Sequence, residues 1–125
     1  MPKLHSSLGP NPRLVRMFLI EKGIGEDQVE RIHYDIITGE NRSSDELTGK
    51  NSLQTLPVFE LEDGTTLTES WPICEFIEEH HAKPNMFGND AKERAEVRKW
   101  VRLFDQEVVV PMTMGFRATG GRPMF

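Results

Sequence analysis

The chain has 125 residues, of which 37% are hydrophobic and 28% are charged, with a formal net charge of -5 at pH 7. This length suits one domain plus a fragment of another, because a core usually needs on the order of 100 residues to bury enough surface. The charges of both signs are mixed along the chain, so neither nucleic acid nor an anionic membrane is expected as a partner. The apolar runs are far shorter than the roughly 20 residues of a membrane span, and no targeting signal precedes the first element.

Cysteine and histidine usage narrows the possible sites further. Cys74 is the single cysteine, which excludes an internal disulfide. The four histidines lack cysteine partners and show no metal-ligand spacing, so no metal is expected. A reducing, cytoplasmic setting is the expected location.

The first half of the chain alternates strand and helix signals. Residues 3–7 predict a short strand, and a helix follows in which Asn11 is the expected N-cap, Pro12 fits the first turn and Gly23 ends the element. Residues 29–36 alternate apolar and polar side chains, which predicts a half-exposed strand. A crossover helix between two short strands makes them parallel.

A second short helix, a hairpin and a third helix are predicted next. Ser43 and Glu46 fit a capping box for a helix at residues 45–48. Residues 56–61 and 65–68 flank an Asp-Gly turn, which is a strong hairpin signal. Ser70 is the expected cap of the helix that extends to His81.

The last part of the chain predicts one amphipathic helix. Asp90 and Glu93 fit another capping box, and apolar residues continue at helical spacing until Pro111, which should kink or end the helix. Residues 118–125 have the composition of a frayed tail and are predicted without structure.

The order of elements predicts an α/β fold, a thioredoxin-like βαβαββα domain at residues 1–85. Residues 86–125 would then form a linker and the first helix of a truncated, incomplete all-α domain.

Three strings follow one another along the first 70 residues: residues 7–16 (SLGPNPRLVR), residues 51–59 (NSLQTLPVF) and residues 67–70 (LTES). Together they resemble the glutathione transferase family. The first looks like its first active-site loop, the second like the segment that ends in its cis-proline, and the third like its glutamyl-binding motif. The similarity extends over residues 3–85 and more weakly along the helix from Asp90. The resemblance implies that glutathione is the co-substrate.

The binding residues that the resemblance implies also make physical sense. Ser70 and the free N–H groups of its helix can hold a carboxylate, while Glu69 can take an ammonium beside it, so together they suit a zwitterionic γ-glutamyl group. The purely structural alternative is that Ser70 is only an N-cap. The resemblance further implies that Pro57 is cis and that the backbone of Leu56 pairs with the cysteinyl part of glutathione.

The residue that activates the glutathione thiol is less clear from the sequence. Members of the family carry a cysteine, serine or tyrosine near the first loop, whereas this chain has Asn11, Gly9 and His5 near those positions. Asn11 is therefore the first candidate, with Ser7 and then Ser6 as hydroxyl alternatives. Asn11 could equally be a purely structural cap.

Other polar residues have weaker assignments. Arg42 and Lys50, with Asn41, lie where the family binds the glycine carboxylate of glutathione, but they also fit ordinary solvated surface. Cys74 is expected to be a small buried core residue. His80 and His81 are expected at the C-terminus of their helix.

The leading hypothesis is a glutathione transferase that activates the thiol of glutathione for attack on a small electrophile. The alternative is a glutathione-binding or protein-interaction module without transferase activity. A thiol-disulfide oxidoreductase is disfavoured, because the loop lacks a Cys-x-x-Cys pair. The apolar face of the helix after Asp90 predicts that the chain is an incomplete unit that pairs as a homodimer.

Overall fold

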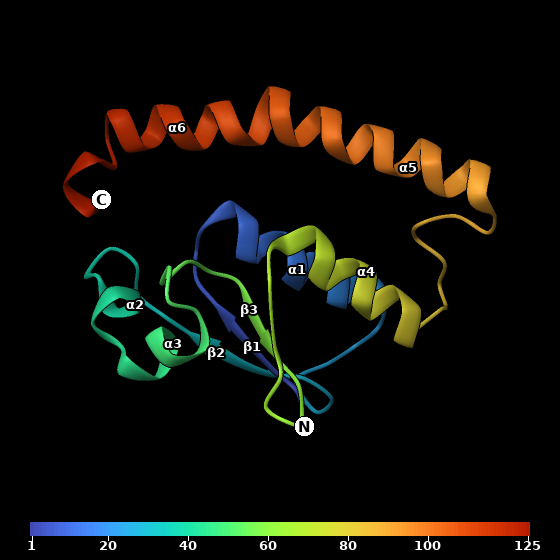
Figure 1. Cartoon of the computed structure of the whole chain (residues 1–125), viewed down its shortest axis with the longest axis horizontal. Coiled ribbons are helices and arrows are strands. Elements are labelled where there is room, and N and C mark those ends of the chain that lie inside the picture. Colours follow the sequence, from blue (N-terminus) through green and yellow to red (C-terminus); the bar gives the residue numbers. More distant parts are fainter. The chain divides into compact units, whose positions relative to one another are not determined.

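A computed structural model describes residues 1–125 (Figure 1). The chain divides into two compact units, Met1–Pro84 and Asn85–Phe125, and each is described by itself.

The first unit is built on a four-stranded mixed sheet in the order β2-β1-β3-β4. The strands are β1 (Lys3–Ser6), β2 (Glu30–His33), β3 (Val58–Glu60) and β4 (Thr66–Thr68). β1 is parallel to β2 and antiparallel to β3, and β3 is antiparallel to β4. The predicted α/β, thioredoxin-like fold is confirmed, and each strand is shorter than its apolar pattern suggested.

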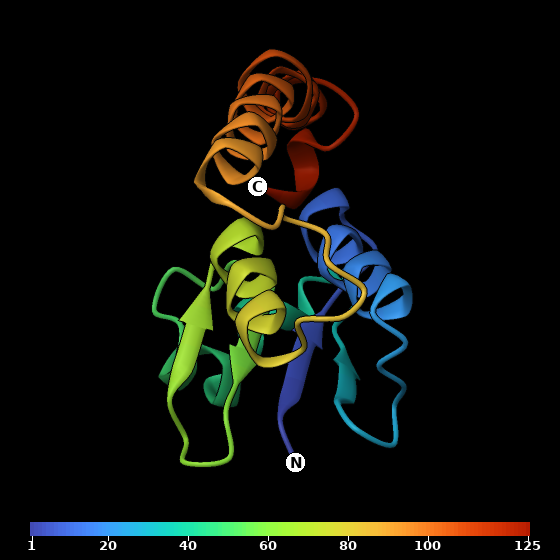
Figure 2. The same cartoon turned by 90° about the vertical axis from the view of Figure 1, so that its right-hand side faces the viewer.

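Helices α1 (Pro10–Glu21) and α4 (Ser70–His80) pack against each other and cover one face of the sheet, as Figure 2 shows. The ring of Phe59 meets that of Phe76 on this face at a centroid distance of 6.3 Å. Leu4 pairs with Phe59 across the two strands and therefore points the same way. The fully buried side chains Leu4, Val15, Leu19 and Ile73 form the centre of this layer.

Helices α2 (Glu40–Ser43) and α3 (Asp45–Lys50) lie across the other face of the sheet (Figure 1). Tyr34, Leu47 and Val58 form the core there. The sequence predicted α3 but not α2, which is a single turn without a periodic apolar face.

Three predicted helix caps are displaced by one or two residues. Gly9 is the N-cap of α1, so Asn11 lies inside the first turn, and Glu69 rather than Ser70 is the N-cap of α4. In α3 the cap is Ser44, whose side chain accepts a hydrogen bond from the N–H of Leu47. Pro10 explains the first shift, because its fixed φ and missing N–H suit the first helical position.

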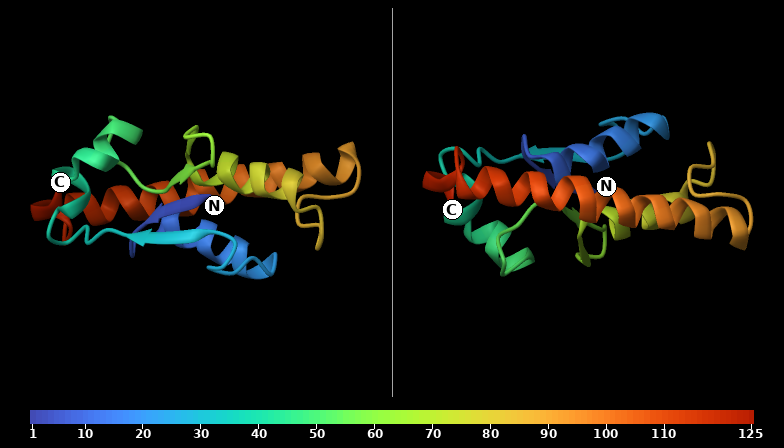
Figure 3. Two further views of the ribbon diagram at one scale, coloured as in Figure 1. Left: turned by 90° about the horizontal axis from the view of Figure 1, so that it is seen from below. Right: turned by 90° about the horizontal axis from the view of Figure 1, so that it is seen from above.

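The second unit contains one long helical segment, which Figure 3 shows from two sides. It consists of α5 (Ala91–Phe104), the π-helical turn Asp105–Val109, and α6 (Val110–Ala118). Asp90 is the N-cap, as predicted, and its carboxylate accepts a hydrogen bond from the N–H of Glu93. The predicted capping box is incomplete, because the Glu93 carboxylate accepts from the N–H of Asn89 rather than from that of Asp90. Of the two predicted effects of Pro111, a kink or an end, the end does not occur, because α6 continues to Ala118. The π-turn directly before Pro111 lets the N–H of Val110 reach the carbonyl of Asp105.

The C-terminal residues are folded, contrary to the prediction of an unstructured tail. The N–H of Gly121 donates to the carbonyl of Phe116 at 2.8 Å, and a short 3-10 helix follows at Arg122–Met124. The rings of Phe116 and Phe125 then meet edge to face. None of the helices has the length and apolar composition to cross a membrane.

Candidate functional site

The sheet register brings the three candidate segments to one edge of the first unit. His5 pairs with Val58, and Val58 pairs with Thr68, so β1 ends beside the start of β3 and the end of β4. The loop after β1, the Leu56–Pro57 bond and the start of α4 therefore adjoin one another. The Leu56–Pro57 peptide bond is cis.

At the N-terminus of α1, Asn11 is the residue whose hydrogen-bond donors are available to a ligand. Pro10 and Pro12 have no N–H, and the N–H of Arg13 already donates to the carbonyl of Gly9. Asn11 is half-buried between the two prolines, and neither its N–H nor its side-chain amide has a partner within the chain. Asn11 can therefore donate hydrogen bonds from both groups at the positive end of the helix.

The N-terminus of α4 lies beside that of α1. The hydroxyl of Ser70, which is buried, donates to the carbonyl of Asn11 at 3.0 Å. The N–H groups of Ser70 and Trp71 remain available in the first turn, whereas Pro72 has none. Because two helix N-termini meet here, the site favours a negatively charged group.

Glu69 has an unusual backbone for its residue type. Its φ is 72° and its ψ is 132°, a region that L-residues other than glycine rarely adopt, and the side chain is exposed without an ion pair. Strained backbone of this kind is concentrated at functional sites. The carboxylate of Glu69 is thus free to bind a cation beside the α4 N-terminus.

Ser6 and Ser7 are both buried, and one arginine contacts them. Nη1 of Arg16 donates to the Ser6 hydroxyl oxygen and to the Ser7 carbonyl, at 2.5 Å in each case. The Ser7 hydroxyl oxygen accepts a hydrogen bond from the N–H of Gly9 at 3.3 Å, and its own proton is left to donate. The sequence analysis did not single out Arg16. The available signal was its spacing, since it lies one helical turn after Pro12 in the predicted helix.

Burial lowers the pKa of Arg16, and repulsion from Arg31 and Arg13 lowers it further. Even so, an arginine remains charged at neutral pH. The loop after β1 therefore adjoins a fixed positive charge as well as a helix N-terminus.

Side-chain amides hold the loop that precedes Pro57. The Asn51 amide donates to the Thr55 carbonyl at 3.0 Å, and the Asn41 amide donates to the Gln54 carbonyl at 3.0 Å. Gln54 has a positive φ of 56°, and its amide donates to the carbonyl of Arg42 at 2.9 Å. These bonds fix the backbone of the loop that leads to Leu56, and they place Arg42 next to it.

Lys50 belongs to a polar network on the α3 face of the sheet. Its ammonium lies 3.3 Å from Glu60 and 3.7 Å from Glu46. His5, fully buried, contacts Glu60 through Nε2 and the Tyr34 hydroxyl through Nδ1, both at 3.0 Å. The hydrogen bond from His5 and the bonds from Lys50 hold the pKa of Glu60 below its ordinary value, whereas burial raises the pKa of Tyr34.

This network is the place where the chain could most nearly hold a metal. The ligand atoms of His5, Glu46 and Glu60 lie within 4.8 Å of one another. However, the Lys50 ammonium already pairs with both carboxylates, which favours an ion-pair network over a cation site. The sequence prediction that Lys50 holds a ligand carboxylate requires it to leave these partners.

Cys74 is fully buried, and burial raises its pKa to about 12, so it is a thiol at neutral pH rather than a nucleophile. At the C-terminus of α4, Nδ1 of His80 contacts the Phe76 carbonyl at 2.9 Å.

The chain is similar to full-length proteins that are about twice as long. It is 31% identical over 114 residues to Glutathione S-transferase 2 of Saccharomyces cerevisiae, covering 90% of this chain but 48% of the yeast protein. A crystal structure of a glutathione S-transferase domain-containing protein from Marinobacter aquaeolei matches with a TM-score of 0.68 and 36% identity. That match covers 78% of this chain and 47% of the bacterial one.

Human glutathione transferase theta-2, crystallised in complex with glutathione, matches with a TM-score of 0.75 and 26% identity over 85% of this chain and 42% of that chain. The family model of the glutathione S-transferase N-terminal domain matches residues 9–80, which include α1, the cis-proline and all of α4. The chain belongs to the glutathione S-transferase family.

Proposed function

We propose that the chain binds glutathione between the N-termini of α1 and α4 and lowers the pKa of its thiol for attack on a small electrophile. The observation that carries this proposal is the junction of the two helix N-termini, joined by the hydrogen bond from Ser70 to the Asn11 carbonyl. The human theta-2 relative binds glutathione, which supports the choice of ligand.

Each end of the glutathione molecule has a proposed partner. The γ-glutamyl carboxylate binds the N–H groups of Ser70 and Trp71, and its ammonium binds Glu69. The Ser70 hydroxyl already donates to Asn11, so it contacts the carboxylate only after it rotates. The backbone of Leu56, beside Pro57, pairs with the cysteinyl part, and Arg42 or Lys50 binds the glycine carboxylate.

Thiol activation is assigned to the first loop. A free cysteine thiol has a pKa of about 8.5, and a helix N-terminus or a neighbouring cation lowers it. Asn11 supplies two unpartnered donors at such a terminus, and Ser7 is the alternative donor. Ser6 is the weakest candidate, because its buried hydroxyl oxygen already accepts a bond from Arg16.

The second candidate function is glutathione binding without transfer, and the lack of a cysteine, tyrosine or exposed serine donor in the first loop favours it. Homodimer formation and a cytoplasmic location remain part of the proposal. The first rests on the exposed apolar side chains of the long helix, and the second on the single unpaired cysteine.

Calorimetric titration of the chain with glutathione tests the binding proposal. We expect Glu69→Gln and Ser70→Ala each to weaken binding about tenfold or more, because each removes a charge-assisted contact of roughly 1.5–3 kcal/mol. Glu79→Gln is the matched control, since Glu79 is an exposed carboxylate on the same helix. Unchanged affinity in both site variants would reject the ligand assignment.

A conjugation assay with a generic aromatic electrophile then separates the two candidate functions. Conjugation above the uncatalysed rate supports the transferase, whereas tight binding without conjugation supports the binding module.

A further inference from the structure

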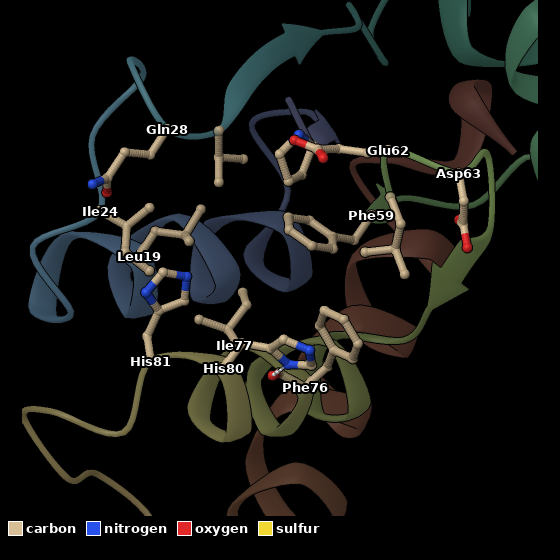
Figure 4. Close-up of a pocket in the computed structure, with 13 residues that line it drawn as sticks. Leu19, Ile24, Gln28, Phe59, Glu62, Asp63, Phe76, Ile77, His80 and His81 are labelled. Atoms are coloured by element: carbon tan, nitrogen blue, oxygen red, sulfur yellow. Dashed lines mark hydrogen bonds between the residues drawn. The ribbon is translucent and has the colours of Figure 1, made fainter.

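The first unit contains a cavity of about 510 Å³, shown in Figure 4. Its walls come from α1, α4, the segment between α1 and β2, and the hairpin between β3 and β4. Small-molecule sites in proteins commonly have volumes of about 300–1,000 Å³, so the cavity is large enough for a ligand of modest size.

The cavity lies at the other end of the sheet from the candidate glutathione site. It includes Pro2, which precedes β1, and Leu19 near the end of α1, whereas the glutathione site is at the end of β1 and the start of α1. Likewise, Ile77 and His80 belong to the last turns of α4. A molecule in the cavity would therefore leave the proposed glutathione site free.

The interior of the cavity is apolar and partly aromatic. Phe59 and Phe76 face each other with their rings tilted by 57°. Figure 4 shows Leu19, Ile24 and Ile77 across from these rings. Such a surface accepts an aromatic or branched aliphatic group.

The charged lining of the cavity is acidic. Glu62 and Asp63 line one side, His80 and His81 line another, and no lysine or arginine lines any part. Glu62 already binds an ammonium, that of the chain's own N-terminus, at 3.0 Å. One Asp63 oxygen accepts from the N–H of Thr65 at 2.8 Å, and Asp63 has no ion-pair partner.

The aromatic lining adds to this preference. The C-terminus of α4 does not, because the Lys22 ammonium already donates to its His81 carbonyl. One face of the Phe76 ring stacks on His80, whereas the Phe59 ring lines the cavity and can attract a cation. The electrostatics of the cavity therefore favour a cation and disfavour an anion.

We propose that this cavity is a second ligand site that binds a small amphipathic cation. The apolar part of the ligand lies against Phe59, Phe76 and Ile77, and its ammonium lies at Asp63 and Glu62. This site goes beyond the proposed glutathione chemistry and does not depend on it.

Two probes that share one ring system but differ in charge test the proposal. The full chain is titrated with 1-naphthylmethylammonium and, separately, with 1-naphthylacetate, and the resonances of Phe76 and His80 are followed by nuclear magnetic resonance. We expect the ammonium probe to bind about tenfold more tightly than the carboxylate probe, because only the former pairs with the acidic side. Equal affinities, or no binding of either probe, would overturn the proposal.

Variants of the acidic side complete the test. Asp63→Asn keeps an oxygen for the Thr65 N–H, so the combined variant Glu62→Gln with Asp63→Asn should fold while it weakens the ammonium probe about tenfold. The control Glu79→Gln removes one carboxylate that does not line the cavity and should leave the affinity unchanged. Displacement of the probe by glutathione, or equal binding by the combined variant, would also overturn it.

Discussion

Asn11 lies between Pro10 and Pro12 in the first turn of α1. Because a proline has no N–H, the hydrogen-bond donors available there are the backbone N–H and the side-chain amide of Asn11. Because Gly9 is the cap, Asn11 does not close the helix, and its side chain has no partner within the chain. Its two unpartnered donors are therefore available for the glutathione thiol in the function proposed above. The alternative of a purely structural cap, open from sequence alone, conflicts with this geometry.

We predict that Asn11→Ala raises the pKa of the bound glutathione thiol while it leaves the stability of the chain nearly unchanged. The loss of one amide donor weakens stabilisation of the thiolate, and no cap is removed. Ultraviolet titration of the bound thiol measures the pKa, and urea unfolding measures the stability. Ser7→Ala is the matched control. An identical titration curve in Asn11→Ala, with a shift in Ser7→Ala, would transfer the role to Ser7.

Lys22 illustrates a residue whose importance no local pattern indicated. Its buried ammonium forms an ion pair with Glu78 and donates to the carbonyls of His81 at 2.8 Å and Pro84 at 2.5 Å. It therefore holds the segment that leaves α4. In the sequence, Lys22 next to Gly23 looks like an ordinary helix end, because its partners lie about 60 residues away.

We predict that Lys22→Met lowers the free energy of unfolding by about 3–5 kcal/mol, since it leaves a buried carboxylate and two carbonyls without their cation. The control Lys3→Met breaks the pair with Glu30, which is exposed and 3.9 Å long, and should cost at most about 1 kcal/mol. Urea unfolding followed by circular dichroism measures both. Equal losses in the two variants would show that Lys22 acts only as surface charge.

At the scale of elements, helix starts were predicted to within one or two residues, and the errors have local causes. Neighbouring residues of similar capping ability, such as Ser43 and Ser44, cannot be separated by pattern. Only the structure shows that Ser44 accepts from Leu47, while Ser43 contacts carbonyls within its own turn. The π-turn before Pro111 could not be predicted either. A proline in a helical sequence predicts a lost hydrogen bond, but it does not predict how the preceding turn rearranges.

We predict that Ser44→Ala destabilises the first unit by about 1 kcal/mol, because it removes the side-chain cap of α3. Ser43→Ala is the matched control and should change the stability by less than about 0.5 kcal/mol, since Ser43 is exposed and caps nothing. Chemical denaturation of both variants gives the comparison. A larger loss for Ser43→Ala would contradict the assignment of the cap.

At the scale of the whole molecule, the order of strands and helices was sufficient to predict the sheet. A short strand-helix-strand crossover followed by a hairpin with an Asp-Gly turn is compatible with few orders of strands in a sheet. The partly buried network of His5, Glu60 and Lys50 was not predicted, because it joins residues from three elements across one face. Candidate residues on continuous motifs, such as Glu69 and Ser70, could be named from the sequence. The contact of Arg16 with the loop after β1 could not be, because it depends on the folded backbone.

The long helical segment carries most of the exposed large apolar side chains of the second unit. None of its side chains from Ala91 to Ala118 is buried, and many large apolar ones are about half exposed, namely Trp100, Leu103, Phe104, Val108, Val110, Met112, Met114 and Phe116. A surface of this kind normally belongs to an interface. The first unit has a buried core, whereas the second buries Phe87 but leaves most of its large apolar side chains exposed.

We predict that the chain self-associates through this segment. Sedimentation velocity should show a sedimentation coefficient that rises with protein concentration, and Phe104→Glu should shift the distribution towards monomer, because a charge at an apolar interface opposes association. Leu53→Glu is the matched control: Leu53 is 76% exposed but lies in a loop of the first unit, so its replacement should leave the association unchanged. A monomer at every concentration would contradict the prediction. Equal effects of the two variants would move the contact away from the helix.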